Sequence, residues 1–456
     1  MNGTILREVL QTIFPISLLL EQARRFNVIQ RDRKVDLVAL IISLVLNTGS
    51  DDSGRLADVY RRYIGEVASK VVRGAFYHWI DKALAKLLEW TLEQALFHVR
   101  ALPVFLPGNL GVVRDWIIVD SETVTLRKAL KKSFPSTSKK KGGIKIHKYF
   151  SVGLGCMVGY RLSSARENDN RNFEITEKDR GLGYLVDLSY ASIAFIKSCA
   201  KYNVKFVIRL KENWQPRVTQ VVIAQLGDYF FEGMNFRFAC DIGSIILDDR
   251  PIDLNVVIGQ GNKKAHCRLV GVQGPHGYLF YLTNLDRNTH TAEQVCELYR
   301  VRWEIELDNK VDKSTARLDQ IRATTESSVK VLVYSSLLHT LLVDLLAYRD
   351  RIERKETQTS IRAPIHPQTL SHVINAHHSD LCRAVLDPTT PDERWEHFAE
   401  LLSFLGRDPN WRSRPSVLDS LCGITAPPGR SKKKKFCECP TSAISYRRMN
   451  TIKKAA

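Results

Sequence analysis

The chain has 456 residues, too many for one ordinary core, and its 44% hydrophobic content is enough for about three packed domains. Its 67 Lys and Arg against 49 Asp and Glu give a formal charge of +18, which favours a polyanionic partner such as nucleic acid. The longest apolar run, residues 37–46, is far shorter than the roughly 18 residues that span a bilayer. No CxxC pair is present, which argues against a zinc finger.

Residues 1–105 carry apolar side chains at helical spacing. Helices are expected within residues 5–13, 35–46, 56–63 and 75–96, with a Gly- and Ser-rich break at residues 49–54. Residues 71–79 could open a helix that reads a DNA major groove, but the signal is weak and a helix that only packs is favoured.

From about residue 106 the pattern changes to the alternation that is typical of strands. An apolar, β-branched run at residues 112–119 predicts a buried strand that ends on Asp120. Residues 149–158 and 160–163 predict a meander, and residues 183–186 predict a short strand that ends on Asp187. A helix is expected next, and after it a strand at residues 204–211. A single Asp at a strand end is commonly a turn former or a helix cap, so neither Asp is diagnostic alone.

The second half of the chain predicts more strands and then helices. The expected strands lie at residues 218–225, 236–240, 252–258, 268–272 and 278–282. Helices are expected at residues 292–313 and 327–350 and within residues 361–421.

Two segments are strongly basic. Residues 127–148 contain nine Lys and Arg and no acid, and we expect them to form a loop beside the Asp120 strand. Residues 423–456 contain nine Lys and Arg and one acid, and we expect this tail to be disordered until it meets DNA.

The most specific pattern is YRVRWEIELDNKVDK at residues 299–313. Here Tyr299, Arg302, Glu306 and Lys313 follow the spacing Y-x2-R-x3-E-x6-K. On a single α-helix these steps place the four side chains within roughly 60° of one another, along about 21 Å of one face. An exposed helix with i,i+4 ion pairs gives the same stripe, so the two upstream Asp strands decide how the pattern is interpreted.

This pattern resembles the YREK signature of bacterial insertion-sequence DDE transposases, the family named after insertion sequence four. The segments around Asp120 and Asp187 resemble the two Asp blocks of that family, and the resemblance covers about residues 5–420. It implies an α/β fold: an RNase H-like catalytic core with a β-rich insertion, preceded by an all-α domain and followed by a helical, basic region. The implied parts are a helical domain that recognises DNA ends (1–105), the RNase H-like core (106–212 and 286–350), the insertion (213–285), a helical region (351–422) and a basic flexible tail (423–456).

The resemblance also implies an enzyme that cleaves and transfers DNA strands with a carboxylate triad. Asp120, Asp187 and Glu306 would be the catalytic residues and the ligands of two Mg²⁺ or Mn²⁺ ions. Such ions prefer carboxylate oxygens, activate the attacking oxygen and stabilise the leaving oxygen.

The implied partners are double-stranded DNA and a second copy of the chain. Tyr299, Arg302 and Lys313 would contact the DNA backbone, both at the element's terminal inverted repeats and at the target. Two copies would hold two ends in a synaptic complex. We expect a cytoplasmic protein that associates with the nucleoid and with no membrane.

Two positions depart from the family pattern. Asp187 is followed by Leu188-Ser189-Tyr190 instead of Arg-Gly-Tyr, and Asp308 and Asn309 replace bulky aromatic residues. Neither change removes an expected metal ligand, but a non-catalytic or decayed DNA-binding descendant stays open as the alternative. A plain RNase H-like nuclease is less favoured, because simple hydrolysis has no evident need of an extended strand clamp.

Overall fold

The computed structural model describes most of the chain. The described residues are 1–29, 35–46, 55–67, 70–211, 213–223, 232–235, 251–274, 277–318, 321–357, 362–413 and 416–418. The expected break at 49–54, the expected strand at 236–240 and the basic tail at 423–456 lie outside them.

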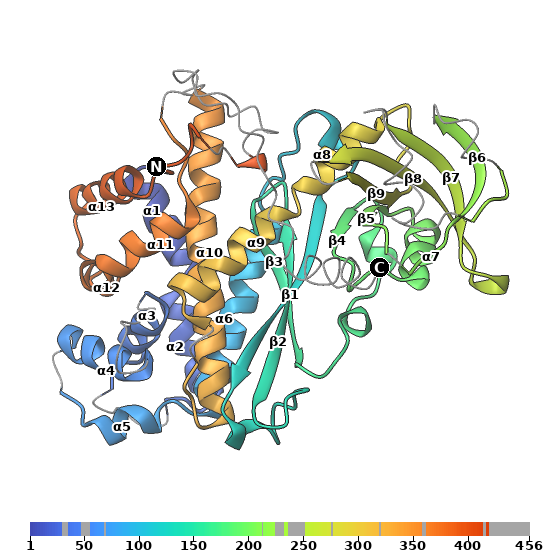
Figure 1. Ribbon diagram of the computed structural model, residues 1–456. Coiled ribbons are helices and arrows are strands. Elements are labelled where there is room, and N and C mark those ends of the chain that lie inside the picture. The colour runs from blue at the N-terminus through green and yellow to red at the C-terminus, as the bar shows by residue number, and fades with distance from the viewer. Residues whose placement is uncertain are drawn as a thin grey trace, which may run out of the picture.

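The strands of the described residues form one mixed sheet in the order β3-β2-β1-β4-β5-β9-β8-β7-β6 (Figure 1). Its strands are β1 (Trp116–Leu126), β2 (Gly142–Ser151), β3 (Cys156–Ser164), β4 (Gly183–Val186), β5 (Lys205–Arg209), β6 (Arg217–Ile223), β7 (Ile252–Ile258), β8 (Ala265–Gly274) and β9 (Gly277–Thr283). The molecule is therefore a mixed α/β protein built on a single large sheet.

The central strands follow the order predicted from the sequence. β1, β2 and β3 form an antiparallel meander, whereas β4 pairs in parallel with both β1 and β5. Helix α7 (Ile193–Lys201) connects β4 to β5, and the Ser192 side chain caps its first turn. Three antiparallel strands followed by strand, helix and strand are thus confirmed.

The predicted end of the first strand at Asp120 is wrong, because β1 continues to Leu126. The β-branched Thr123 and Thr125 keep the ladder with β2 intact, opposite Lys145 and Gly143. Asp120 therefore lies in the middle of a strand, where it pairs with Lys148 of β2 and directly follows the last residue that pairs with β4.

The predicted basic loop is also shorter than expected. β2 begins at Gly142, so Lys145 and Lys148 belong to a strand, and Lys148 is buried. The single strand expected at residues 149–158 is divided by a turn at residues 152–155, where Gly155 adopts φ +65. Hydrophobic alternation did not reveal these ends, because β2 begins on two glycines, carries Lys145 and Lys148, and is followed by an apolar turn that contains Val152 and Leu154.

Strands β6 to β9 continue the same sheet. β9 pairs with β5 through Ile208 and Leu282, and β8, β7 and β6 follow outwards as antiparallel neighbours. The β segments expected after residue 213 are confirmed where they are described. The domain boundaries proposed from the sequence stay predictions.

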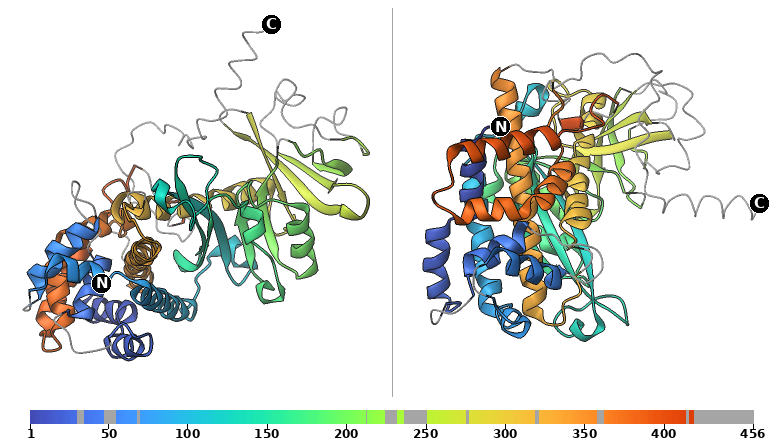
Figure 2. Two further views of the ribbon diagram at one scale, coloured as in Figure 1. Left: turned by 90° about the horizontal axis from the view of Figure 1, so that it is seen from below. Right: turned by 90° about the vertical axis from the view of Figure 1, so that its left-hand side faces the viewer.

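Helices from both ends of the chain pack together beside the sheet (Figures 1 and 2). The backbone N–H of Gly3 donates to the Glu396 carboxylate at 2.5 Å, so the two ends of the helical layer are in direct contact. These helices are α1 (Gly3–Ile13), α2 (Ile16–Arg25), α3 (Leu37–Leu46), α4 (Arg55–Glu66), α5 (Arg73–His78), α6 (Lys82–Arg100), α10 (Glu326–Thr357), α11 (Pro367–Ala376), α12 (His378–Leu386) and α13 (Asp392–Leu405).

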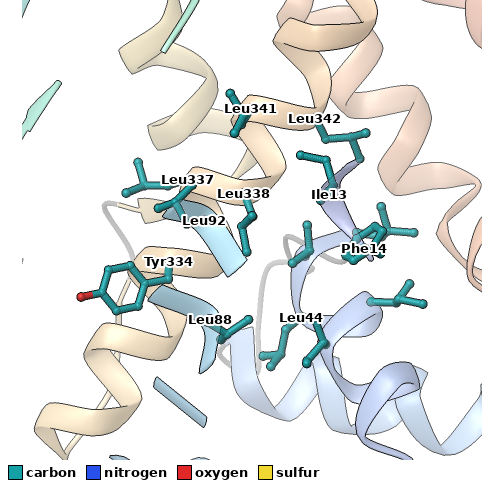
Figure 3. Close-up of a cluster of buried hydrophobic side chains, with 14 of the residues drawn as sticks. Ile13, Phe14, Leu44, Leu88, Leu92, Tyr334, Leu337, Leu338, Leu341 and Leu342 are labelled. Carbon is teal, nitrogen blue, oxygen red and sulfur yellow. The ribbon is translucent and has the colours of Figure 1, made fainter. Parts of the chain in front are cut away.

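Helix α10 runs through the middle of this layer. Its Leu337, Leu338 and Leu341 lie among side chains of α1, α3 and α6, and all three are completely buried (Figure 3). The stretches Gly3–Arg25 and Glu326–Arg354 are long and apolar enough to cross a membrane, but core helices satisfy the same criterion. The apolar window of the second stretch is 100% buried, as expected for a core helix.

One face of the sheet carries two hydrophobic clusters with charged residues between them. Near the start of β1, Trp116 and Ile118 pack under α8 (Ala292–Arg300), whereas Val124 and Leu126 join the helical core around α10. Asp120 and Glu122 lie between these two clusters, because alternate residues of a strand share a face. The opposite face packs on α7.

Candidate active site

Asp120 and Asp187 occupy matching positions on two parallel strands. β1 and β4 pair through Val119 and Val186, and each Asp is the next residue along the chain. Val119 and Val186 pack with α7, so alternation directs the two carboxylates to the other face. α9 (Trp303–Lys310), which carries Glu306, packs against β1 (Figure 1).

The surroundings of Asp120 make its negative charge costly. One carboxylate oxygen accepts from the backbone N–H of Ser121 at 2.8 Å, and the other accepts from the Asn309 side-chain amide at 3.0 Å. Burial is the main reason why the pKa of Asp120 rises to about 6. The carboxylates of Asp187 and Glu306 raise this pKa further, while Arg302 lowers it. Asp187 and Glu306 are therefore close enough to Asp120 to influence its protonation.

Arg302 joins this group of acids. Its guanidinium is mostly buried and forms an i,i+4 ion pair with Glu306. Burial lowers the pKa of Arg302, but Tyr299, Glu306 and Asp187 outweigh burial and raise it overall. Arg302 thus supplies a fixed positive charge between Glu306 and the two Asp residues.

Tyr299 lies in the interior, not on the surface. Its side chain is 9% exposed, its ring is 4.9 Å from the ring of Tyr281, and burial raises its pKa to about 12. The hydroxyl donates to the Val186 carbonyl at 3.3 Å, directly before Asp187. Tyr299 therefore connects α8 to the end of β4.

The single helix predicted for residues 292–313 is wrong. α8 ends at Arg300, and two i→i−3 hydrogen bonds, from Val301 to Leu298 and from Arg302 to Tyr299, turn the chain before α9 begins. α9 ends at Lys310, and residues Val311–Thr315 form a π-helical turn. Side-chain spacing alone cannot distinguish an unbroken helix from three helical segments in a row.

Lys313 lies in this π-helical turn and is about half exposed. Its ammonium is 3.6 Å from the Glu122 carboxylate, two residues beyond Asp120 on the same face of β1. The structure thus brings Asp120, Asp187, Glu306 and Arg302 together, with Tyr299 beneath them and Lys313 at the margin.

Several residues that surround the site were missed or misjudged from the sequence. Asn309 and Asp308 stood out only as departures from a family pattern. In the structure Asn309 donates a hydrogen bond to Asp120, and Asp308 accepts one from Lys148. Glu122 and Lys148 gave no signal beyond their charge. A usable signal was present, since Glu122 follows Asp120 by two residues and strand alternation places both on one face.

The carboxylates suit a divalent cation, although other groups contact them in this structure. Arg302 is ion-paired with Glu306, and the Asn309 side-chain amide donates a hydrogen bond to Asp120. Within the described residues, no group of three or more His, Cys, Asp or Glu side chains is gathered closely enough to hold a metal ion. Any coordination of a cation by Asp120, Asp187 and Glu306 therefore requires their side chains to rearrange.

Comparison with known families agrees with this site. Residues 113–342, just over half of the chain, match the family model described as Transposase DDE domain. That segment contains all three acids together with Arg302 and Lys313.

Individual relatives are distant or partial. The transposase for insertion sequence element IS1151 of Clostridium perfringens is 23% identical over 271 residues, which cover 52% of this chain and 57% of the relative. The transposase for insertion sequence element IS421 of Escherichia coli is 40% identical over 68 residues, which cover 15% of this chain and 18% of the relative. The chain thus spans only part of the length of each.

One solved structure aligns with most of the chain. The piggyBac transposase synaptic complex with hairpin DNA covers 96% of this chain and 88% of that chain, at a TM-score of 0.47 and 12% sequence identity. A likeness at this level supports neither a fold assignment nor a function.

Proposed function

Because the chain belongs to the transposase DDE domain family, we propose that it is an insertion-sequence transposase that cleaves and transfers DNA strands. The observation that carries this proposal is that Asp187 and Glu306 both raise the pKa of Asp120, and that the two Asp residues directly follow paired positions on the parallel strands β1 and β4. Phosphodiester chemistry requires an activated oxygen nucleophile and neutralisation of charge at phosphorus and at the leaving oxygen.

An RNase H-like core is the fold that this proposal requires. Its support is the strand order β3-β2-β1-β4-β5, with β2 antiparallel to its neighbours and α7 crossing between β4 and β5. In this arrangement Asp120 and Asp187 come from the two central strands. Strands β9 to β6 would be the insertion that helps to shape the bound DNA end.

Asp120, Asp187 and Glu306 would hold two Mg²⁺ or Mn²⁺ ions. The donor set fits, since all three are carboxylates, and the pKa of Asp120 is raised mainly by burial and also by Asp187 and Glu306. When bound, the ions supply Lewis acidity and an activated oxygen nucleophile. Arg302, released from Glu306, would then be free to bind a DNA phosphate.

Double-stranded DNA is the proposed partner. The segment between β1 and β2 exposes a group of cations beside the strand that carries Asp120, and exposed cations bind phosphates with little sequence preference. These cations are Arg127, Lys128, Lys132, Lys139, Lys140 and Lys141. A homodimer on paired element ends, in the cytoplasm and at the nucleoid, completes the proposal.

The alternative is a decayed descendant that binds DNA without cleaving it. Alanine variants at Asp120, Asp187 and Glu306 distinguish the two functions. We expect each to lower cleavage of an element end by at least about a hundredfold, because each removes a ligand that stabilises the transition state. DNA affinity should change by no more than about twofold, because phosphate contacts by Lys and Arg dominate it.

The matched control is Glu304→Ala, two residues before Glu306 on the same helix. Its carboxylate accepts from Ser416 and Leu418, away from Asp120. This variant should cleave at close to the wild-type rate. A triad variant that cleaves as fast as Glu304→Ala would remove that residue from the proposed mechanism.

A further inference from the structure

We infer that Lys148 is a positioning residue that fixes the Glu306 helix against the Asp120 strand. The inference rests on the proposed function, since its purpose is to keep Glu306 within reach of Asp120. It concerns a side chain that none of the proposed catalytic steps uses.

Lys148 lies at the right place for this role. It is paired directly across from Asp120 in the β1–β2 ladder, so its side chain leaves the sheet on the same face. The residue is 1% exposed, although Lys is almost never fully buried unless it is paired. Its ammonium therefore depends on protein partners alone.

Those partners join the sheet to the helix. Lys148 Nζ donates to Asp308 Oδ2 at 2.6 Å and is also ion-paired with Asp312. Asp308 follows Glu306 by two residues, and Asp312 lies in the π-helical turn that follows α9. The third carboxylate, that of Glu122 on β1, is 3.9 Å away. One ammonium thus connects both turns that follow Glu306 to the strand of Asp120.

Neighbouring contacts strengthen the same junction. The Thr340 hydroxyl of α10 donates to Asp312, and Lys313 pairs with Glu122 at 3.6 Å. Asn309, which lies between Asp308 and Asp312 in sequence, donates to Asp120 at 3.0 Å. The backbone here departs from α-helical geometry into a π-helical turn, a feature often found at functional sites.

The charge balance shows why Lys148 is needed. Asp308, Asp312, Glu122 and Asp344 all lie buried in this junction. Lys148 is the fully buried cation among them. Without it, several carboxylates would stay buried with no counter-charge, and they would separate the helix from the sheet.

The test compares a charge-neutralised junction with an unrelated core defect. Lys148→Met alone would leave buried acids unpaired and could prevent folding, so the main variant is Lys148→Met/Asp308→Asn/Asp312→Asn. The control is Leu92→Ala on α6, which weakens the helical core without touching the junction. The readouts are amide hydrogen exchange of peptides within residues 303–315 and cleavage of element-end DNA over a range of Mg²⁺ concentrations.

We expect faster exchange in residues 303–315 of the triple variant, DNA affinity within about twofold of wild type, and cleavage at least about tenfold slower with a higher half-saturating Mg²⁺ concentration. Leu92→Ala should lower the melting temperature but keep wild-type exchange in that segment and the wild-type Mg²⁺ response.

Wild-type exchange in residues 303–315 of the triple variant would overturn the inference, and so would faster exchange with unchanged cleavage. If wild-type protein cleaves no element end with any metal, the proposed function fails, and the catalytic purpose of Lys148 fails with it. The exchange result separates that failure from a failure of the positioning role alone.

Discussion

Opposing influences act on the Asp120 carboxylate. Burial and two nearby acids disfavour its charge, whereas Arg302 and the hydrogen bond from Ser121 favour it. The net effect is a pKa of about 6, well above the ordinary value of 3.8. In the absence of a cation, Asp120 therefore holds its proton at a pH where an exposed Asp has lost it.

This raised pKa predicts a pH-dependent contribution to stability. A group whose folded-state pKa is raised stabilises the fold below its unfolded pKa, and this contribution is lost as the pH rises through the folded pKa. For Asp120 the change between about pH 4 and pH 7 is about 3 kcal/mol, from a shift of 3.8 to about 6.

Asp120→Asn should remove this contribution. The free energy of unfolding of wild type minus that of the variant, from urea titrations without metal, should fall by up to about 3 kcal/mol from about pH 4 to pH 7. Addition of Mg²⁺ should reduce the fall. A difference that does not vary with pH would show that Asp120 is an ordinary, solvated carboxyl group.

At the scale of elements, the sequence was most informative about the strands that carry acids. The apolar runs before Asp120 and Asp187 are buried strands, because few side chains other than branched and aromatic ones fit a sheet that is covered on both faces. The position of Asp120 within its strand was not predictable, because it depends on the partner strand β2. The break between α8 and α9 was likewise not predictable, and it lies next to Tyr299, whose hydroxyl donates to the Val186 carbonyl of β4, distant in sequence.

Tyr299 illustrates how tertiary contact changes the role expected from a motif. The spacing predicts that Tyr299 contacts DNA phosphates, whereas its hydroxyl donates to the Val186 carbonyl. Tyr299→Phe separates the two roles. Loss of one hydrogen bond at the end of β4 should slow cleavage by roughly fivefold, corresponding to about 1 kcal/mol, with DNA affinity unchanged.

Tyr348→Phe is the matched control, because that buried hydroxyl donates to the Pro103 carbonyl at 2.9 Å, in another part of the fold. It should change stability but not the cleavage rate. If Tyr299→Phe instead weakens DNA binding, measured by fluorescence anisotropy, the hydroxyl contacts DNA as the motif predicts.

Helices from the N-terminal part of the chain and helices within residues 326–405 pack into one core. Residues 1–105 were predicted to form a helical domain that recognises DNA ends, which stays a prediction, and in the structure α1 packs against both α13 and α10. Apolar periodicity identified α1, α3 and α4, missed α2 and merged α5 and α6 into one helix. It could not show which helices pack together. Pairing between β5 and β9 was hidden for the same reason, since all strands of a sheet have the same kind of sequence pattern.

The shared helical core predicts a large effect of one buried leucine. Leu341 of α10 is fully buried among helices from both halves of the chain. Leu341→Ala should lower the free energy of unfolding by about 2–5 kcal/mol in urea titrations, because it leaves a cavity as well as removing apolar contact. The exposed Phe404→Ala should change it by less than about 0.5 kcal/mol. Equal effects of the two substitutions would contradict the shared core.

Asp120, Asp187 and Glu306 are proposed to form a metal-dependent site that cleaves DNA. The most direct test measures nicking of a labelled duplex of the protein's own element end. The duplex is incubated with wild type and with Glu306→Gln, in Mg²⁺, in Ca²⁺ and without metal. We predict nicking at the element terminus by wild type in Mg²⁺ alone, and none by Glu306→Gln. Specific binding without nicking in Mg²⁺ or Mn²⁺, or nicking by Glu306→Gln at the wild-type rate, would contradict the claim.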